Sequence, residues 1–301
     1  MKRVALKILI VVLIAVLIGA GIWAGVYFLA PTDQSDGNYP VQLGSLTLKE
    51  KPQRICSLSP GVTDALRALG ASGRVAFLSD YCSDEGTHGA KRVGSLYAPD
   101  FRVLSEQIPD LAVSLGEPSD AVLQRMNLLE IPFLVLQPAD SLEGLKDNAE
   151  ILAKAVYGVK AGAQKYQSYL ADLNYQLKTC KAYAETQNIS VLWLTGDGTK
   201  AFTEDTLGGS LLREAGFRNA APGKEFAWDE TQMPEGDYRI LMIDEALWES
   251  FSPARKEQLK AGVDGTVFFP GSLIERQSPE LTGLYEKLQL ELNRLGAGKE
   301  D

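Results

Sequence analysis

Short apolar runs alternate with helical patterns through the first half of this chain. We interpret four of these runs as strands, at residues 54–58, 75–78, 109–114 and 132–136. Between them, apolar residues three or four positions apart predict helices. Ser59-Pro60 has the N-cap serine and the first-turn proline that open a helix after the first strand. This alternation predicts a parallel sheet with helices on both of its faces.

The same alternation returns in the second half of the chain. Strands are predicted at 190–194, 238–243 and 265–270, and helices at 207–215, 252–261 and 278–295. A short hairpin at 41–48, with apolar residues on either side of Gly44-Ser45, precedes the first half. The chain is therefore predicted to form two α/β lobes.

A continuous helical pattern separates the two halves. From Val159 to Cys180, apolar residues recur at alternating intervals of four and three, and no proline occurs between Pro138 and Pro222. We predict one long helix over 141–184 that packs against its own domain. A rigid helix between two lobes leaves a cleft, and we expect the carboxyl ends of the strands, where ligands bind in open α/β sheets, to face it.

An apolar segment near the N-terminus predicts a membrane anchor. Residues 8–30 are uncharged, and the basic residues Lys2, Arg3 and Lys7 precede them. About 20 apolar residues at about 1.5 Å each cross a ~30 Å hydrocarbon core as a helix. The basic end is expected to stay in the cytoplasm. A cleaved signal peptide is the alternative, but Phe28-Leu29-Ala30 has a bulky residue where a cleavage site has a small one.

The predicted organisation has five parts along the chain. They are a transmembrane signal-anchor at 1–30, a tether at 31–40, an N-terminal lobe at 41–140, a connecting helix at 141–184 and a C-terminal lobe at 185–301. The tether is assigned because its residues are polar and favour turns. We therefore expect a single-pass protein of the cell membrane whose lobes lie outside the cytoplasm.

Charge excludes some partners of the predicted lobes. The chain has a net charge of −9, and about −12 remains when the three basic residues before the apolar segment are set aside. An acidic surface of this kind argues against nucleic acid and against anionic lipid as partners.

The scarcity of reactive residue types excludes several chemistries. His88 is the single histidine, so no site with several histidine ligands can form. Cys56, Cys82 and Cys180 have neither the spacing of a disulfide framework nor that of a zinc motif, and we interpret them as buried or unreactive thiols. Adjacent carboxylates such as Asp244-Glu245 point in opposite directions at a strand end, which disfavours a hydrolase. We predict no enzymatic activity, no cofactor and no bound metal.

Several segments of the sequence resemble one known family, the substrate-binding proteins of ABC transporters for cobalamin, haem and ferric siderophores. The segments that resemble the start of the family's sequences are residues 54–60 (Arg-Ile-Cys-Ser-Leu-Ser-Pro), 63–64 (Thr-Asp) and 69–70 (Leu-Gly). Later matches are 80–82 (Asp-Tyr-Cys), 92–94 (Arg-Val-Gly), 109–113 (Pro-Asp-Leu-Ala-Val), 214–219 (Glu-Ala-Gly-Phe-Arg-Asn) and 275–279 (Glu-Arg-Gln-Ser-Pro). Together they cover roughly 41–292 in order and are most like the cobalamin binders.

The resemblance implies a fold and a set of ligand contacts. The fold class is α/β, with two three-layer α/β/α lobes joined by one long helix, here preceded by a transmembrane helix. Little hinge motion is implied. The ligand-binding residues implied by the matching segments are Ser59, Pro60, Asp80, Tyr81, Cys82, Tyr97, Trp193, Trp228 and Arg276. Aromatic walls with a few polar groups suit a large, flat ligand such as a tetrapyrrole.

The resemblance also implies docking to a permease, with one departure. Family members usually have one acidic residue on the outer face of each lobe, which pairs with arginines of the permease. In the first lobe Arg102 occupies that position, and Glu106, one helical turn later, is the candidate substitute. In the second lobe the candidates are Glu230 and Glu235. Reversed charge at a docking point lowers association rate and affinity.

The function that the sequence favours is ligand capture for transport. We expect a membrane-anchored, monomeric substrate-binding component that delivers a corrinoid to ABC permease and ATPase subunits. Haem or a ferric siderophore is the alternative ligand, although Arg92 and Arg276 are the only good candidates for the cleft arginines that an anionic siderophore needs. A non-transporting signalling or scaffold domain of the same fold is the alternative function, because the docking charge is altered.

Overall fold

The computed structural model describes residues 38–87, 89–186, 188–221, 223–228 and 238–297. The predicted membrane segment 8–30, the single histidine His88 and the docking candidates Glu230 and Glu235 lie outside these residues. Within the described ranges, no helix combines the length and the apolar character needed to cross a membrane.

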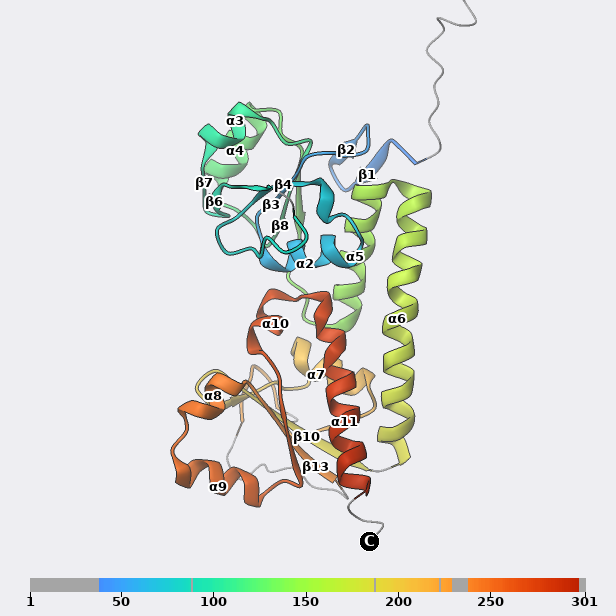
Figure 1. Cartoon of the computed structure of the whole chain (residues 1–301), viewed down its shortest axis with the longest axis vertical. Coiled ribbons are helices and arrows are strands. Elements are labelled where there is room, and N and C mark those ends of the chain that lie inside the picture. Colours follow the sequence, from blue (N-terminus) through green and yellow to red (C-terminus); the bar gives the residue numbers. More distant parts are fainter. Residues whose placement is uncertain (1–37, 88, 187, 222, 229–237, 298–301) are drawn as a thin grey trace, which may run out of the picture. The chain divides into compact units, whose positions relative to one another are not determined.

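The first half of the chain forms the predicted parallel sheet (Figure 1). Its strands lie in the spatial order β5 (Lys91–Arg92), β4 (Val75–Leu78), β3 (Ile55–Ser57), β8 (Leu111–Leu115) and β9 (Phe133–Leu136). All neighbouring pairs are parallel. The chain crosses between these strands through α2 (Pro60–Ala68), α3 (Phe101–Glu106) and α4 (Asp120–Leu128).

Both faces of this sheet are buried, because successive residues of a strand point to opposite faces. Ile55 packs in one apolar cluster with residues of α2, and its neighbour Cys56 packs in another with residues of α3 and α4. Leu111 and Ala112 of β8 divide between the same two clusters. The first lobe therefore has the three predicted layers.

The second half forms a second sheet, in the order β11 (Lys200–Ala201), β10 (Ile189–Thr195), β13 (Tyr238–Ile243) and β14 (Gly265–Phe268), with β12 (Arg218–Asn219) also paired to β10. Only the β10–β11 hairpin is antiparallel among these pairs. The helices that accompany this sheet are α7 (Leu207–Glu214), α8 (Glu245–Ser250), α9 (Pro253–Ala261), α10 (Gly271–Arg276) and α11 (Gly283–Ala297).

This second sheet is also covered on both faces. Val191 and Trp193 of β10 pack with α7 and α11 on one face. Leu192 and Leu194 pack with α8 and α9 on the other. The four core clusters of the described residues lie between Tyr39 and Leu295. Residues Asn38–Asp301 form one compact unit.

The prediction of one helix over 141–184 was wrong. The segment forms two helices, α5 (Leu142–Tyr157) and α6 (Val159–Thr186), which pack side by side (Figure 1). Gly158 ends α5 with a left-handed φ of 87°, which glycine adopts without steric cost. Asn38 then caps α6: its carbonyl oxygen accepts from the N–H of Val159 at 2.8 Å, and its Oδ1 accepts from the N–H of Ala161 at 2.9 Å.

Both helices span the two lobes. Leu142 at the start of α5 belongs to the core of the second lobe, and Val156 near its end belongs to that of the first. Along α6, Tyr166 packs on the first core and Leu173 on the second. The lobes are therefore connected by a helical pair, and the apolar periodicity of Val159 to Cys180 describes its second member.

The remaining elements are short. The predicted hairpin is present as β1 (Val41–Leu43) and β2 (Leu46–Leu48), and a second hairpin is formed by β6 (Gly94–Ser95) and β7 (Ala98–Pro99). The described residues also include the 3₁₀ turns η1 (Ser72–Arg74) and η2 (Pro279–Thr282). The predicted helix at 278–295 therefore begins as the 3₁₀ turn η2 and continues as α11.

Candidate ligand-binding cleft

The carboxyl edges of the two sheets meet at one junction. The segment that leaves β9 passes Ala139, whose N–H donates to Oε1 of Gln277 and whose carbonyl accepts from Nε2 of Gln277, both at 2.8 Å. Gln277 follows α10, which in turn follows β14. A second contact with the second lobe follows at the start of α5, where the N–H of Leu142 donates to Oγ of Ser210 in α7 at 3.1 Å. Strand ends of both lobes are thereby fixed around a common space.

The start of α2 lies close against the second lobe. A Cβ at Gly61 would overlap the backbone carbonyl oxygen of Arg276, so glycine is required at this point of α2. Nearby, Asp64 is buried and lies 3.1 Å from Nη2 of Arg67 and 3.8 Å from Nη1 of Arg276. Arg67 also pairs with Glu280 of the second lobe. The seam between the lobes is therefore tight and charged.

A cavity of about 600 Å³ opens on the second-lobe side of this junction. Its position is set by Thr195, the last residue of β10, and by the junction residues Ala139 and Gln277. Because β10 belongs to the parallel part of the sheet, the cavity lies beyond a carboxyl strand end, where open α/β sheets bind ligands. Its volume is that of a small-molecule site.

The floor of the cavity is apolar. Phe202 and Phe226 line it, with ring centroids 5.6 Å apart in an edge-to-face arrangement. Phe226 is partly exposed, so its ring is open to a ligand. The N–H of Phe226 donates to Oγ1 of Thr203 at 3.2 Å, which fixes the loop that presents the ring. Leu207 and Ile274 complete the apolar lining.

The rim of the cavity is acidic. Asp140, Glu225 and Glu275 line it, and none of the three side chains has a hydrogen-bond or ion-pair partner within the described ranges. Asp205, the fourth carboxylate, accepts from the hydroxyl of Thr203 at 2.6 Å. That bond, with the bond from the N–H of Glu225 and the nearby Lys224, holds the pKa of Asp205 below its ordinary value. All four carboxylates are exposed.

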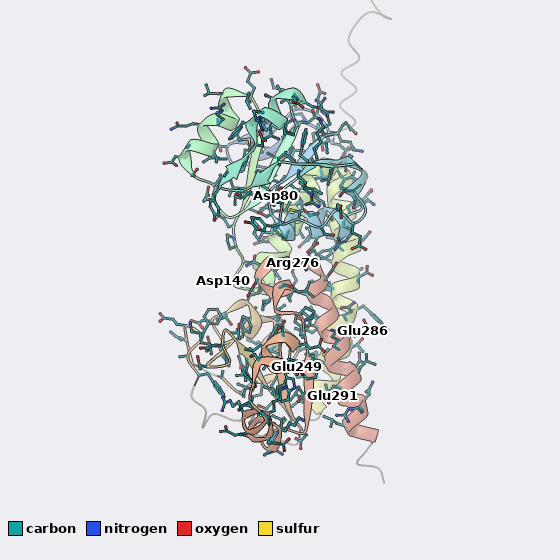
Figure 2. All side chains as sticks on the ribbon, turned by 60° about the vertical axis from the view of Figure 1, so that its left-hand side comes forward. Asp80, Asp140, Glu249, Arg276, Glu286 and Glu291 are labelled. Atoms are coloured by element: carbon teal, nitrogen blue, oxygen red, sulfur yellow. The ribbon has the colours of Figure 1, made fainter. Side chains whose placement is uncertain are left out.

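The predicted contacts of the first lobe lie at its carboxyl edge, and two of them are strongly exposed. Asp80-Tyr81 follows β4, and the side chain of Tyr81 is 75% exposed. Tyr97, in the turn between β6 and β7, is 69% exposed. The N–H of Asp80 donates to the carbonyl of Gly94 at 2.7 Å, which brings the two segments together. Figure 2 labels Asp80 in this lobe and Asp140 on the segment after β9.

Ser59 and Pro60 have structural roles at the same edge. Ser59 is the N-cap residue of α2 and Pro60 is its first residue, as predicted. The Ser59 side chain makes no cap bond; its Oγ accepts from the N–H of Leu115 at 3.0 Å and is buried. This bond ties β8 to the start of α2.

Two predicted contacts are core residues rather than cleft residues. Trp193 is 2% exposed, with its ring 4.7 Å from that of Phe202 and 5.7 Å from that of Phe269, so it supports the cavity floor from behind. Cys82 is buried with its Sγ 3.5 Å from Oγ of Ser79. Both side chains are buried by packing within the protein, so a ligand in the cleft would not reach them. Neither residue is part of the proposed site.

Trp228 and Arg276 also differ from the prediction. Trp228 packs against the core on the α8–α9 face of the sheet, with the guanidinium of Arg255 5.8 Å from its ring, and it is absent from the cavity lining. Arg276 points to the seam, where its Nε donates to the carbonyl of Ser272 at 3.2 Å and its guanidinium faces Asp64 (Figure 2). Its neighbours Glu275 and Gln277, not Arg276 itself, line the cavity.

The three thiols are buried, in agreement with the sequence interpretation. Burial raises the pKa of Cys180 to about 12 and raises that of Cys56 still further. These two thiols are therefore protonated and unreactive at neutral pH.

On the outer face of the first lobe, an acidic and a basic side chain lie near the expected docking point for a permease. Glu106 is exposed and lies 3.7 Å from Nζ of Lys91. Arg102 is exposed and pairs with Asp100 at 3.2 Å. The hydrogen bond from Arg102 is the largest of the influences that lower the pKa of Asp100.

Sequence reasoning missed the residues that form the cavity floor and rim. Phe202 and Phe226 stand outside any strand or helix with an apolar period, so no pattern marked them. The only signal in the sequence was an aromatic residue directly after a short hairpin strand, followed by Thr203-Glu204-Asp205-Thr206 as a helix start.

Comparison with solved structures identifies the fold. The periplasmic vitamin B12-binding protein of Vibrio cholerae is similar, with a TM-score of 0.58, 17% identity, 81% of this chain covered and 98% of that one. The petrobactin-binding protein of Bacillus subtilis has a TM-score of 0.63 and 19% identity, with 85% and 98% covered. The periplasmic haem-binding protein of Roseiflexus sp. RS-1, in its apo form, has a TM-score of 0.60 and 16% identity, with 81% and 98% covered.

No family model matches the sequence. No curated protein matches it either. The structural neighbours are solute-binding proteins rather than enzymes, and this chain has their two-lobed α/β fold. The resemblance seen in the sequence is thereby confirmed for the fold.

Proposed function

We propose that this protein is the extracytoplasmic substrate-binding component of an ABC importer, and that its ligand is a corrinoid. Residues 8–30 anchor it in the cell membrane, and the lobes act outside the cytoplasm as a monomer. It performs no chemistry: it captures the ligand in the cleft and delivers it to permease and ATPase subunits. The fold that it shares with solved binding proteins supports this proposal.

The observation on which the proposal rests is the cavity at the junction of the lobes. Its floor offers Phe202 and Phe226, and the edge of the first lobe exposes Tyr81 and Tyr97. Aromatic surface on both lobes favours a large ligand with an extended apolar face. A corrin ring has such a face.

The charges near the cavity favour a corrinoid over haem and ferric siderophores. Carboxylate-bearing or catecholate ligands are held by free arginines. Arg92 already donates to the carbonyls of Ser79 at 2.8 Å and Cys82 at 2.6 Å. Arg276 is engaged at the seam with Asp64. Both predicted cleft arginines therefore already have partners within the protein, which disfavours an anionic ligand.

Delivery to a permease requires a docking point on each lobe. We propose Glu106 for the first lobe and Glu230 or Glu235 for the second. The exposed Arg102 beside Glu106 is the observation that favours the second candidate function, a signalling or scaffold domain that does not dock on a permease.

The test is a calorimetric titration of residues 32–301, which retain every core cluster, with cyanocobalamin, dicyanocobinamide and haemin. We expect a corrinoid to bind and haemin not to bind. Phe226→Ala is expected to weaken corrinoid binding roughly tenfold, because a buried phenyl ring contributes about 1.5–3 kcal/mol. Tyr175→Ala, at an exposed tyrosine of α6, is the matched control and is expected to change nothing.

Binding of haemin alone would replace the corrinoid by haem. If folded protein binds none of the three ligands, both tetrapyrrole assignments are wrong. Siderophores and the non-transport function then become the hypotheses to test.

A further inference from the structure

We infer that the cavity selects a ligand that combines an apolar body with a positive charge. This inference rests on the proposed function in that it assigns the ligand of the same cleft. It goes further because it fixes the sign of the ligand's charge at the second lobe, which neither the fold nor its solved neighbours determine.

The charge of the cavity is of one sign. Four carboxylates line it, those of Asp140, Asp205, Glu225 and Glu275, and its described lining includes no lysine, arginine or histidine. Asp205 is partly compensated by Lys224. The other three have no partner among the described residues, so their charge is directed to solvent or to a ligand.

Backbone contacts hold these carboxylates around one space. Ala139 and Gln277 are joined by a pair of 2.8 Å hydrogen bonds. Asp140 directly follows Ala139, and Glu275 lies two residues before Gln277, so the same bonds hold these two carboxylates near each other. The N–H of Glu225 donates to both carboxylate oxygens of Asp205 at 3.2 Å. The rim therefore presents its charges from four separate segments, which these hydrogen bonds hold together in two pairs.

The floor suits a cation as well as an apolar body. Phe226 and Phe202 present aromatic rings beneath the acidic rim. The faces of such rings attract cations, and they also bury apolar surface. A fully hydrated small cation would gain nothing from this floor, so the ligand has to bring apolar surface with its charge.

The facing edge of the first lobe does not reverse this charge. It presents Asp80, and Glu117, which accepts from Nε2 of Gln137 at 3.0 Å. Its arginine, Arg92, is held by backbone carbonyls and by Asp84, whose Oδ2 is 3.7 Å away. Among corrinoids, forms with water on cobalt are cationic whereas dicyano forms are neutral, so the cavity favours the former.

Two ligand pairs test the inference on residues 32–301 by calorimetry. The first pair, tetraphenylphosphonium and tetraphenylborate, has nearly the same shape and opposite charge. We expect the phosphonium to bind at least about tenfold more tightly than the borate. Each exposed carboxylate attracts the cation weakly and repels the anion by a similar energy, and the four effects add up. The second pair, diaquacobinamide and dicyanocobinamide, tests the same preference within the proposed function.

The matched variants separate the cavity from the general acidity of the chain. Glu225→Gln/Glu275→Gln removes two unpartnered charges from the rim without changing side-chain size. We expect it to reduce the phosphonium preference about fourfold or more. Glu257→Gln/Glu286→Gln removes two exposed charges elsewhere on the second lobe, one of them labelled in Figure 2, and we expect no change.

Equal binding of phosphonium and borate, no binding of either, or equal effects of the two double variants would each overturn the inference. Failure of every corrinoid to bind, with the phosphonium preference intact, would instead overturn the corrinoid assignment alone. The two proposals are therefore tested separately.

Discussion

Asp110 in the first lobe and Asp264 in the second occupy equivalent places, one residue before β8 and one residue before β14. Each binds an arginine at the amino end of the neighbouring strand, Arg54 just before β3 and Arg239 within β13. Oδ2 of Asp110 accepts from the backbone N–H of Arg54 at 2.9 Å, and Oδ1 pairs with its guanidinium at 2.7 Å. Oδ2 of Asp264 accepts from the N–H of Arg239 at 2.8 Å and pairs with its side chain at 3.1 Å. The amino edges of both sheets use the same contact.

The carboxyl edges, by contrast, differ between the lobes. The first exposes Tyr81 and Tyr97 and keeps its arginine bound to backbone carbonyls. The second recedes into a cavity with an aromatic floor and an acidic rim. The comparison indicates that the amino edges stabilise the two sheets in a common way. The difference between the carboxyl edges is what the proposed function requires, because there the two edges hold different parts of a ligand.

The largest effect expected from this comparison separates two aromatic residues that the sequence treats alike. Trp193→Ala should lower the free energy of unfolding by about 3–5 kcal/mol, because the indole is buried between Phe202 and Phe269. Tyr81→Ala should change it by roughly 0.5 kcal/mol or less, since the ring is exposed. Urea denaturation followed by circular dichroism measures both.

Ligand affinity should show the opposite order for correctly folded samples of the two variants. Tyr81→Ala is expected to weaken corrinoid binding without loss of stability. A stable Trp193→Ala protein with abolished binding would show instead that Trp193 is a ligand contact, contrary to its burial.

The seam between the lobes is the next largest test. Gly61→Ala places a methyl group against the backbone carbonyl of Arg276, which cannot move aside as a flexible side chain would. We expect a loss of about 1–3 kcal/mol in unfolding free energy, typical of overpacking. Gly73→Ala is the matched control, because a Cβ there meets no atom within 4 Å. Equal stability of both variants would show that the lobes separate readily at this seam.

Much of the fold was predictable because local patterns reflect burial. The strand at 190–194 and the helix start at Ser59-Pro60 were found from apolar runs and capping residues alone. The break at Gly158 was missed, because Asn38, which caps the following helix, is far away in the sequence. A helical period continues across such a break without any change in its apolar spacing.

The site was less predictable than the fold for a related reason. Asp80 and Tyr81 follow β4 at the carboxyl edge of the first sheet, as the strand order predicts, since topology alone decides which edge they reach. Their contact with a ligand stays a prediction. Trp193 and Trp228 were assigned from the family resemblance, and the structure packs both against cores. The rim carboxylates come from segments brought together only by tertiary contacts, so no spacing in the sequence indicated them.

The smallest expected effect concerns the shared contact at the amino edges. Burial alone would raise the pKa of Asp110, but hydrogen bonds from the guanidinium of Arg54 and from the N–H groups of Gln53 and Arg54 hold it below its ordinary value. This carboxylate therefore contributes stability that is fully present above the unfolded pKa of about 4 and is lost as pH falls through the lower pKa of the folded state. Because the pair is partly exposed, we expect Asp110→Asn to cost about 1 kcal/mol or less at neutral pH.

Unfolding measured from about pH 6 to about pH 2.5 distinguishes charge from shape in this contact. The difference between the native protein and Asp110→Asn should shrink as the native carboxylate becomes protonated. Asp264→Asn in the second lobe should cost a similar amount at neutral pH, since Asp264 also accepts from the backbone N–H and the guanidinium of one arginine, Arg239. A cost that stays constant with pH would mean that the geometry of the side chain, rather than its charge, stabilises the edge. A cost in one lobe only would show that the two edges, despite their similar contacts with arginine, do not contribute equally to the stability of their sheets.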